Sequence, residues 1–149
     1  MISIRYATKR DTNSIASFNS TMAMETEDKL LNAETVQKGV ENAFENNKKG
    51  FYLIAESDGT QVGQLMITKE WSDWRNGDFW WIQSVYVHPD FRGKGIYKQL
   101  YDKVKKLAQS NGRVCGIRLY VEKENITAQK VYSKLGMIET DYLLYEEEF

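Results

Sequence analysis

The 149-residue sequence has little of several residue types, and each shortage narrows the kind of protein it encodes. It contains one cysteine, one proline and one histidine. One cysteine cannot form a disulfide within the chain, and one histidine cannot build a histidine-based metal cluster, so we expect no metal site. Cys115 falls in an apolar stretch and is predicted to be a core thiol. The scarcity of proline, without a glycine- or serine-rich stretch, predicts a single domain over residues 1–149.

An excess of one charge is missing as well. The 20 Lys and Arg residues are balanced by 21 Asp and Glu residues, so the net charge is −1. No basic field is present to recruit nucleic acid. There is also no apolar run of the length that spans a membrane or forms a signal peptide. We therefore expect a cytoplasmic protein without a nucleic-acid or membrane partner.

One stretch past the middle of the chain joins a strand, a turn and a helix. Residues 80–87 are β-branched and aromatic almost without interruption, which predicts a strand buried on both faces and ended by Pro89. From Ile96 to residue 107 apolar side chains recur at helical spacing. The strand and the helix are connected through Arg92-Gly93-Lys94-Gly95.

This basic turn is suited to an anion. Glycines allow a backbone to approach an anion closely, and the first turn of a helix offers N–H groups without partners. Arg92 and Lys94 add positive charge. A Walker A loop would need Ser or Thr after the Gly-Lys pair, and a dinucleotide fingerprint would need glycine where Lys98 stands, so both are excluded. The spacing alone is compatible with a diphosphate site and with a simple tight turn.

The residues Arg92-Gly93-Lys94-Gly95-Ile96-Tyr97 resemble motif A of the GNAT superfamily of acyl-CoA-dependent N-acetyltransferases, written Arg/Gln-x-x-Gly-x-Gly/Ala. Tyr97 replaces the usual small residue, so its side chain must point away from the cofactor. The resemblance implies that the backbone amides of residues 92–97 bind the pyrophosphate of CoA. It also implies that the strand residues Val85, Tyr86 and Val87 pair with the pantetheine arm.

The remaining pattern predicts an α/β (α+β) fold with the order β-α-α-β-β-β-α-β-α-β(-β). This is the GNAT order, a mixed and mostly antiparallel sheet of six to seven strands with helices on both faces. The predicted strands are 2–6, 51–56, 61–68, 80–87, 114–121 and one or two within 137–147. The predicted helices follow Asp11, Asn32, Gly95 and Asn125, and turns are predicted at Asp58-Gly59 and Asn76-Gly77.

A second match to the family lies near the C-terminus. Asn125-x-x-Ala128-x-x-x-Tyr132-x-x-Leu135-Gly136-Met137 resembles the Asn…Ala…Tyr…Gly-Phe pattern of GNAT enzymes. A spacing of seven puts Asn125 and Tyr132 on one face of a helix. The resemblance implies that both contact the cofactor and that Tyr132 protonates the leaving thiolate, and Lys134 is a candidate contact for the CoA phosphate. Without the motif, a core tyrosine explains Tyr132 equally well.

No residue type marks the general base that an amine needs before it can attack a thioester. Many relatives carry a Glu on the central strand, but residues 79–87 contain no carboxylate. Gln83 and Ser84 are suited to hold a water, and Glu70 is the carboxylate we favour to receive the proton through it. Asp73, Asp78 and Glu122 remain alternatives.

Two acidic and two aromatic residues suggest the acceptor. Glu25 and Glu27 in the first-helix region and Trp71 and Trp74 before the central strand would form a cation pocket together with Gln83. A solvated acidic loop, with the tryptophans in core or dimer contacts, fits the same residues.

The sequence therefore predicts an acyltransferase that moves an acetyl group from acetyl-CoA to the primary amine of a small cationic molecule, by direct attack in a ternary complex. Two alternatives stay open. One is a non-catalytic acyl-CoA sensor, which the absent strand carboxylate and Tyr97 favour. The other is a protein N-acetyltransferase. A homodimer is compatible with the aromatic content and a C-terminal strand.

Overall fold

The computed structural model describes residues 1–149, which form two compact units, Met1–Leu119 and Tyr120–Phe149. The strands and helices of the first unit are β1 (Ile2–Tyr6), α1 (Thr12–Glu27), α2 (Ala33–Glu45), β2 (Gly50–Ser57), β3 (Thr60–Ser72), β4 (Gly77–Val87), α3 (Ile96–Ser110) and β5 (Val114–Arg118). Short 3-10 turns, η1 (Lys9–Asp11) and η2 (Pro89–Phe91), precede α1 and α3. The second unit contains α4 (Ile126–Lys134). None of the helices has the length and apolar character needed to cross a membrane.

The five strands form one sheet in the order β1-β2-β3-β4-β5. Neighbouring strands are antiparallel except β4 and β5, which are parallel. This confirms the mixed α/β fold, but the predicted count of six to seven strands is wrong. Residues 137–147 form no strand. A strand needs a partner for its backbone groups, and the second unit offers only α4.

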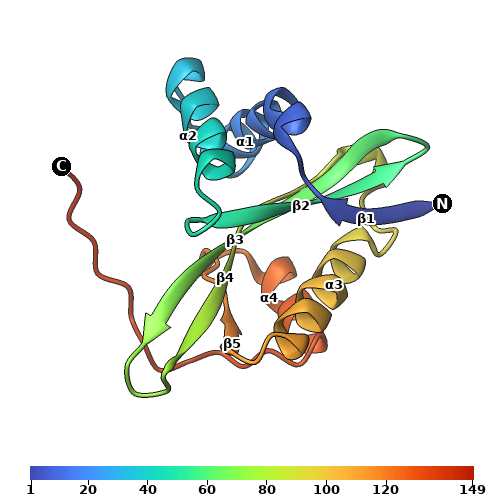
Figure 1. Ribbon diagram of the computed structural model, residues 1–149. Coiled ribbons are helices and arrows are strands. Elements are labelled where there is room, and N and C mark those ends of the chain that lie inside the picture. The colour runs from blue at the N-terminus through green and yellow to red at the C-terminus, as the bar shows by residue number, and fades with distance from the viewer. The chain divides into compact units, whose positions relative to one another are not determined.

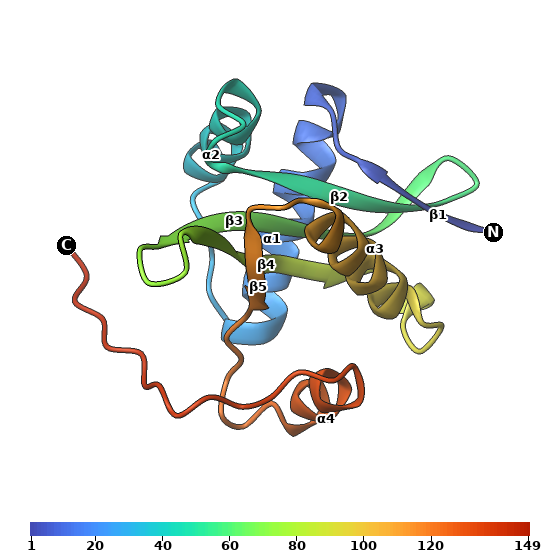
Figure 2. The same cartoon turned by 60° about the horizontal axis from the view of Figure 1, so that its bottom comes forward.

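Helices α1 and α2 lie on one face of the sheet and α3 lies on the opposite face (Figures 1 and 2). On the α1–α2 face, Ile15, Val40 and Ile54 are among the buried core residues. On the other face, Leu100 and Val104 of α3 are fully buried. The helical spacing of these apolar residues is what directs α3 onto the sheet, as the sequence predicted.

The turn signals of the sequence are confirmed. Asp58 and Gly59 have φ of 50° and 79° between β2 and β3, and Asn76 has φ of 46° directly before β4. The hairpin of β3 and β4 is longer than predicted and projects beyond the helices (Figure 1). β5 is shorter than the predicted 114–121, because its pairing with β4 ends at the pair of Trp81 and Arg118.

The prediction that β4 is buried on both faces holds for only part of the strand. Trp80 and Ile82 are buried, each with 4% exposure, whereas Trp81 and Gln83 on the alternate face are half-buried. Met66, the partner of Gln83 in β3, lies at the border of the core that α1 and α2 cover. The sheet face at Trp81 and Gln83 is therefore only partly covered by α1 and α2. Cys115, expected in the core, is exposed.

Candidate functional site

The turn between β4 and α3 leaves room and hydrogen-bond donors for a ligand. Gly93 and Gly95 have φ of 73° and 75°, a region that favours glycine, and a Cβ on either would have no atom within 4 Å. The backbone N–H groups of Gly93, Lys94 and Gly95 donate to no acceptor in the protein. Gly95 is the N-cap of α3, whose first N–H groups have no partner within the helix. Together these groups form a row of donors at the positive end of a helix dipole, which suits a diphosphate.

The segment before the glycines is held in one conformation by its own backbone. In η2, Phe91 N–H donates to the His88 carbonyl at 2.9 Å and Arg92 N–H to the Pro89 carbonyl at 3.2 Å. The Lys94 ammonium lies 5.0 Å from the centroid of the Phe91 ring, so its charge stays near the turn. His88 Nδ1 accepts a hydrogen bond from the Asp90 backbone, which gives this single histidine a place in the turn.

Arg92 makes contacts that the sequence analysis did not anticipate. It donates to Glu25 Oε2 of α1 at 2.7 Å and to the carbonyl of Val87 at 2.8 Å. Tyr86 completes the cluster, since its hydroxyl donates to Glu25 Oε1 at 3.3 Å. The bond from Arg92 is the main cause of a lowered pKa of Glu25, and burial is the main cause of a raised pKa of Tyr86. Arg92, predicted to bind the diphosphate, and Glu25, predicted to bind the acceptor, thus form one ion pair.

The second half of β4 is irregular and lacks a neighbour on one side. Gln64 of β3 pairs with Tyr86, and Met66 pairs with Gln83, so two residues of β4 face one residue of β3. This is a β-bulge, and Ser84 within it has φ of 50°. On the other side, β5 pairs with β4 only as far as Trp81. The predicted pantetheine-binding residues Val85 to Val87 therefore have a free backbone edge on the side of β5.

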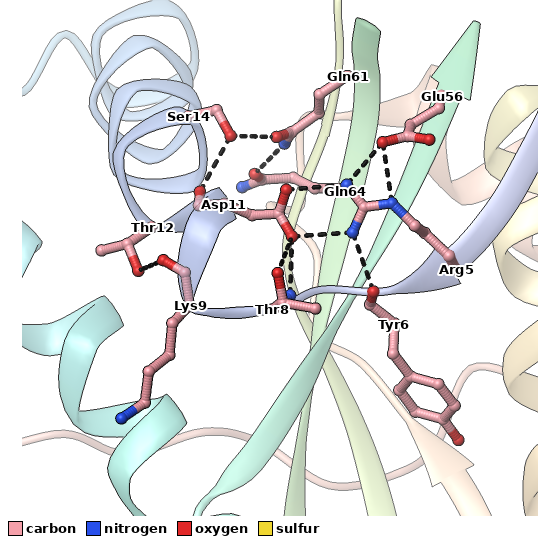
Figure 3. Close-up of polar contacts among 10 residues, drawn as sticks. All are labelled: Arg5, Tyr6, Thr8, Lys9, Asp11, Thr12, Ser14, Glu56, Gln61 and Gln64. Carbon is pink, nitrogen blue, oxygen red and sulfur yellow. Dashed lines mark hydrogen bonds and ion pairs between the residues drawn. The ribbon is translucent and has the colours of Figure 1, made fainter. Parts of the chain in front are cut away.

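A chain of polar side chains connects α1 to the bulge, and Figure 3 shows its members Ser14, Gln61 and Gln64. Gln64 is fully buried, and its Nε2 donates to Asn19 Oδ1 of α1 at 2.8 Å and to the carbonyl of Ser84 at 3.4 Å. Its Oε1 accepts from Gln61 at 3.0 Å, and Gln61 accepts from the Ser14 hydroxyl. The sequence analysis missed Gln64, although a glutamine within the apolar run 62–67 was a visible signal.

Glu70, the favoured base, lies in a cluster of arginines and an aromatic ring. Arg118 Nη1 donates to Glu70 Oε1 at 2.9 Å. The Arg118 guanidinium lies 3.5 Å from the centroid of the buried Phe79 ring, and that of Arg75 lies 5.0 Å from it. Neither arginine was among the predicted site residues, because Arg118 reaches Glu70 only through the register of β3, β4 and β5.

The predicted cation pocket is not assembled as one cluster in the first unit. Trp71 and Trp74 are 65% and 86% exposed. Trp71 pairs with Asp78 near the start of β4, whereas Glu25 bonds to Tyr86 near its end. At about 3.3 Å per residue, these points lie roughly 26 Å apart along the strand.

The two other predicted acceptor residues occupy different surroundings. Gln83 Nε2 donates to the Thr68 hydroxyl, so the side chain is fixed on the open part of the sheet face. Glu27 is exposed at the last position of α1. Gln83 is thus the predicted acceptor residue that lies nearest in sequence to the bulge.

Asn125, Tyr132 and Lys134 belong to the second unit. Asn125 Oδ1 accepts a hydrogen bond from Ala128 N–H at 3.1 Å and so caps α4. Burial raises the pKa of Tyr132, which keeps its phenol protonated. Lys134 is the last residue of α4.

The model of the Acetyltransferase (GNAT) family matches residues 18–137. The L-amino acid N-acyltransferase MnaT of Escherichia coli K12 is 30% identical over 148 residues, which cover 93% of this chain and 81% of that protein. An uncharacterized N-acetyltransferase of Methanocaldococcus jannaschii is 32% identical over 99 residues, 66% of this chain, and the match spans 43% of that protein's length. The crystal structure of a possible acetyltransferase from Clostridium difficile 630 superposes with a TM-score of 0.94 and 45% identity, covering 100% of this chain and 98% of that one.

Proposed function

Because the chain belongs to the GNAT family of acetyltransferases, we propose that it transfers an acetyl group from acetyl-CoA to the primary amine of a small molecule. The observation that carries this proposal is the glycine turn before α3. Its N–H groups donate to no acceptor in the protein, and no atom lies within 4 Å of where a Cβ on Gly93 or Gly95 would stand. Such a turn fits the diphosphate of CoA, and the free edge of β4 beside it fits the amide-containing pantetheine arm.

When bound, acetyl-CoA supplies the thioester that the amine attacks and the thiolate that leaves. The chain's own groups bind and orient it. The amides of residues 92–97 hold the diphosphate, and the backbone of Val85, Tyr86 and Val87 pairs with the pantetheine. The N–H of Val85, a residue without a register partner in β3 or β5, would donate to the carbonyl oxygen of the thioester. Asn125 and Lys134 are proposed as further cofactor contacts, as the family pattern implies.

Two side chains handle protons in this proposal. Tyr132 is the acid for the leaving thiolate, and its raised pKa keeps that proton available at neutral pH. Glu70 lies opposite Phe79, six residues from Val85 along β4, which is roughly 20 Å at about 3.3 Å per residue. Glu70 therefore receives the amine proton only through water, held by Gln83 and Ser84.

The role of Glu70 is tested by the pH dependence of acetyl transfer. If this carboxylate accepts the proton, Glu70→Gln should change the pH profile of kcat/KM. Because the substitution also weakens the contact with Arg118, the matched control is Arg118→Gln, which loosens the same ion pair and keeps the carboxylate. A profile of Glu70→Gln identical to that of the wild type removes Glu70 from the mechanism.

For the acceptor we propose a small amine of cationic character. Because the predicted pocket is not one cluster, the indoles of Trp71 and Trp74 on the β3–β4 hairpin and the carboxylate of Glu27 at the end of α1 are proposed as separate contacts for a cation. An amino acid is the second candidate. It is favoured by the name of the MnaT relative and by the pairing of Glu25 and Glu70 with arginines, which cancels their charge. A thiol-release assay with spermidine, kanamycin and L-methionine separates the two, because turnover with L-methionine alone rejects the cationic acceptor.

Two other functions would give different results in the same assay. Binding of acetyl-CoA without turnover of any amine would indicate an acyl-CoA sensor. Turnover with peptides alone would indicate a protein N-acetyltransferase. No binding of CoA or acetyl-CoA by calorimetry would refute the proposal at its base.

We also propose that the protein acts in the cytoplasm as a homodimer. The exposed apolar side chains near the C-terminus, Tyr142 to Tyr145, each at least 70% exposed, support a contact with a second copy. An exposed thiol at Cys115 suits a reducing compartment. Light scattering of the full chain at several concentrations tests the dimer.

A further inference from the structure

The peptide group between Ser84 and Val85 lies within the β-bulge of β4. Neither residue has a register partner in β3, and β5 ends its pairing at Trp81. Ser84 also has a positive φ of 50°, which is uncommon for a residue with a side chain. Without a ladder to hold it, the direction of this peptide group must be set by something else.

The side chain of Gln64 is the group that contacts it. Nε2 of Gln64 donates to the Ser84 carbonyl at 3.4 Å, and the residue is fully buried. A carbonyl oxygen only accepts, so the NH₂ end of the amide must face Ser84. The Oε1 end then faces Gln61 Nε2 at 3.0 Å. The second N–H of Gln64 donates to Asn19 Oδ1 at 2.8 Å.

The amide of Gln64 is therefore locked from both ends. Asn19 belongs to α1 and Gln61 to β3, and Gln61 is bonded in turn to Ser14 of α1. In Figure 3 one dashed line joins the amides of Gln61 and Gln64, and another joins Gln61 to Ser14. A buried amide that rotated would lose all three bonds at once, which is costly in an apolar interior.

We propose that Gln64 is a positioning residue that directs the Val85 N–H. In a planar trans peptide the carbonyl and the N–H point in opposite directions. With its carbonyl turned to Gln64, the Ser84–Val85 peptide directs its N–H away from Gln64 and from β3, toward the edge of β4 that β5 leaves free. This inference rests on the proposed function, in which that N–H donates to the thioester oxygen.

The infrared measurement reads the thioester carbonyl directly and needs no amine acceptor, and kcat is measured with the amine that turns over in the thiol-release assay. Acetyl-CoA labelled with ¹³C at the carbonyl is bound to the full chain, and the infrared stretch of that carbonyl is recorded. Hydrogen bonding lowers the stretching frequency, so the wild type should show a lower frequency than free acetyl-CoA. Gln64→Met keeps the shape of the side chain but cannot donate. In this variant the carbonyl frequency should move most of the way back to that of free acetyl-CoA, and kcat should fall about tenfold. The Kd for CoA, which lacks the thioester carbonyl, should change less than twofold.

Gln61→Met is the matched control. It breaks the same polar chain and disturbs the same region, but it leaves the contact of Gln64 with Ser84 in place. It should retain the infrared shift and kcat while losing stability. If Gln64→Met keeps the shift as well, Gln64 has only a structural role and the inference is wrong. If the wild type binds no acetyl-CoA, the proposed function fails first, and the two failures are distinct.

A second variant serves if Gln64→Met does not fold. Gln64→Glu has nearly the same volume, and its ionised carboxylate cannot donate to Ser84. Burial raises the pKa of such a carboxyl, so the infrared shift should be small at high pH and recover as the pH falls and a donor returns. A shift equal to that of the wild type at every pH would overturn the inference.

Discussion

Two glycines in different turns allow the ligand role of the turn before α3 to be separated from its backbone strain. Gly95 and Gly59 have φ of 75° and 79°, and a Cβ on either would meet no atom within 4 Å. Gly59 lies in the hairpin between β2 and β3 and is not one of the proposed CoA-binding residues. Gly95→Ala and Gly59→Ala therefore impose the same backbone penalty, and only the first places a methyl group where the diphosphate would lie.

The expected magnitudes follow from this geometry. An alanine in the left-handed region costs about 1–2 kcal/mol. For a chain of this length, 1 kcal/mol lowers Tm by roughly 2–4 °C, so both variants should melt a few degrees lower by nearly the same amount. A methyl group at Gly95 also keeps the ligand from at least one N–H. A hydrogen bond to a charged group is worth about 1.5–3 kcal/mol, so the Kd for CoA should rise roughly tenfold to a hundredfold.

Calorimetric titration with CoA and a thermal melt of each variant make the comparison. Gly59→Ala should leave the Kd within about twofold of the wild type, since its turn contacts no ligand. Equal Kd values for the two variants would refute the assignment of the diphosphate to this turn. A lower Tm for Gly95→Ala alone would instead show that the penalty is not one of backbone conformation.

Two further predictions concern stability. Arg5 donates two hydrogen bonds of 2.8 Å to Asp11, and these are the main cause of a lowered pKa of that carboxyl (Figure 3). A lowered folded pKa stabilises the protein above the ordinary value near 3.9, and this stabilisation is lost as the pH falls through the folded pKa. In thermal melts, Asp11→Asn should be less stable than the wild type by about 1–2 kcal/mol at pH 6, and the difference should shrink below pH 4. A Cβ at position 116 would lie 2.6 Å from the Phe79 ring, so Gly116→Ala should cost about 1–3 kcal/mol in urea unfolding. Gly112→Ala, where a Cβ meets nothing within 4 Å, should cost much less, and equal losses would contradict the packing argument.

Local patterns were sufficient to predict most of the elements. Asn32 was predicted to cap a helix, and its side chain accepts from Thr35 N–H at 2.9 Å at the start of α2. The Asp58-Gly59 signal predicted the turn between β2 and β3. These features depend on residues a few positions apart, which a sequence displays directly.

Features that depend on pairing between distant segments were beyond such patterns. The apolar and aromatic residues within 137–147 are typical of a strand, but an element becomes a strand only beside a partner. In the same way, the ion pairs of Arg92 with Glu25 and of Arg118 with Glu70 join residues 67 and 48 positions apart. The buried role of Gln64 was concealed because a bulge, which has no sequence signature of its own here, determines where its amide points.

The ion pair between Arg92 and Glu25 changes how an anion meets the turn before α3. The sequence suggests that two cations, Arg92 and Lys94, attract the anion. In the structure, however, the charge of Arg92 is already balanced by the carboxylate of Glu25, 2.7 Å away. The long-range attraction then comes from Lys94 and the helix end, and a single exposed cation is screened beyond about 8–10 Å at physiological salt. Capture of the nucleotide end of CoA should thus depend only weakly on ionic strength, with the short-range backbone donors providing most of the affinity.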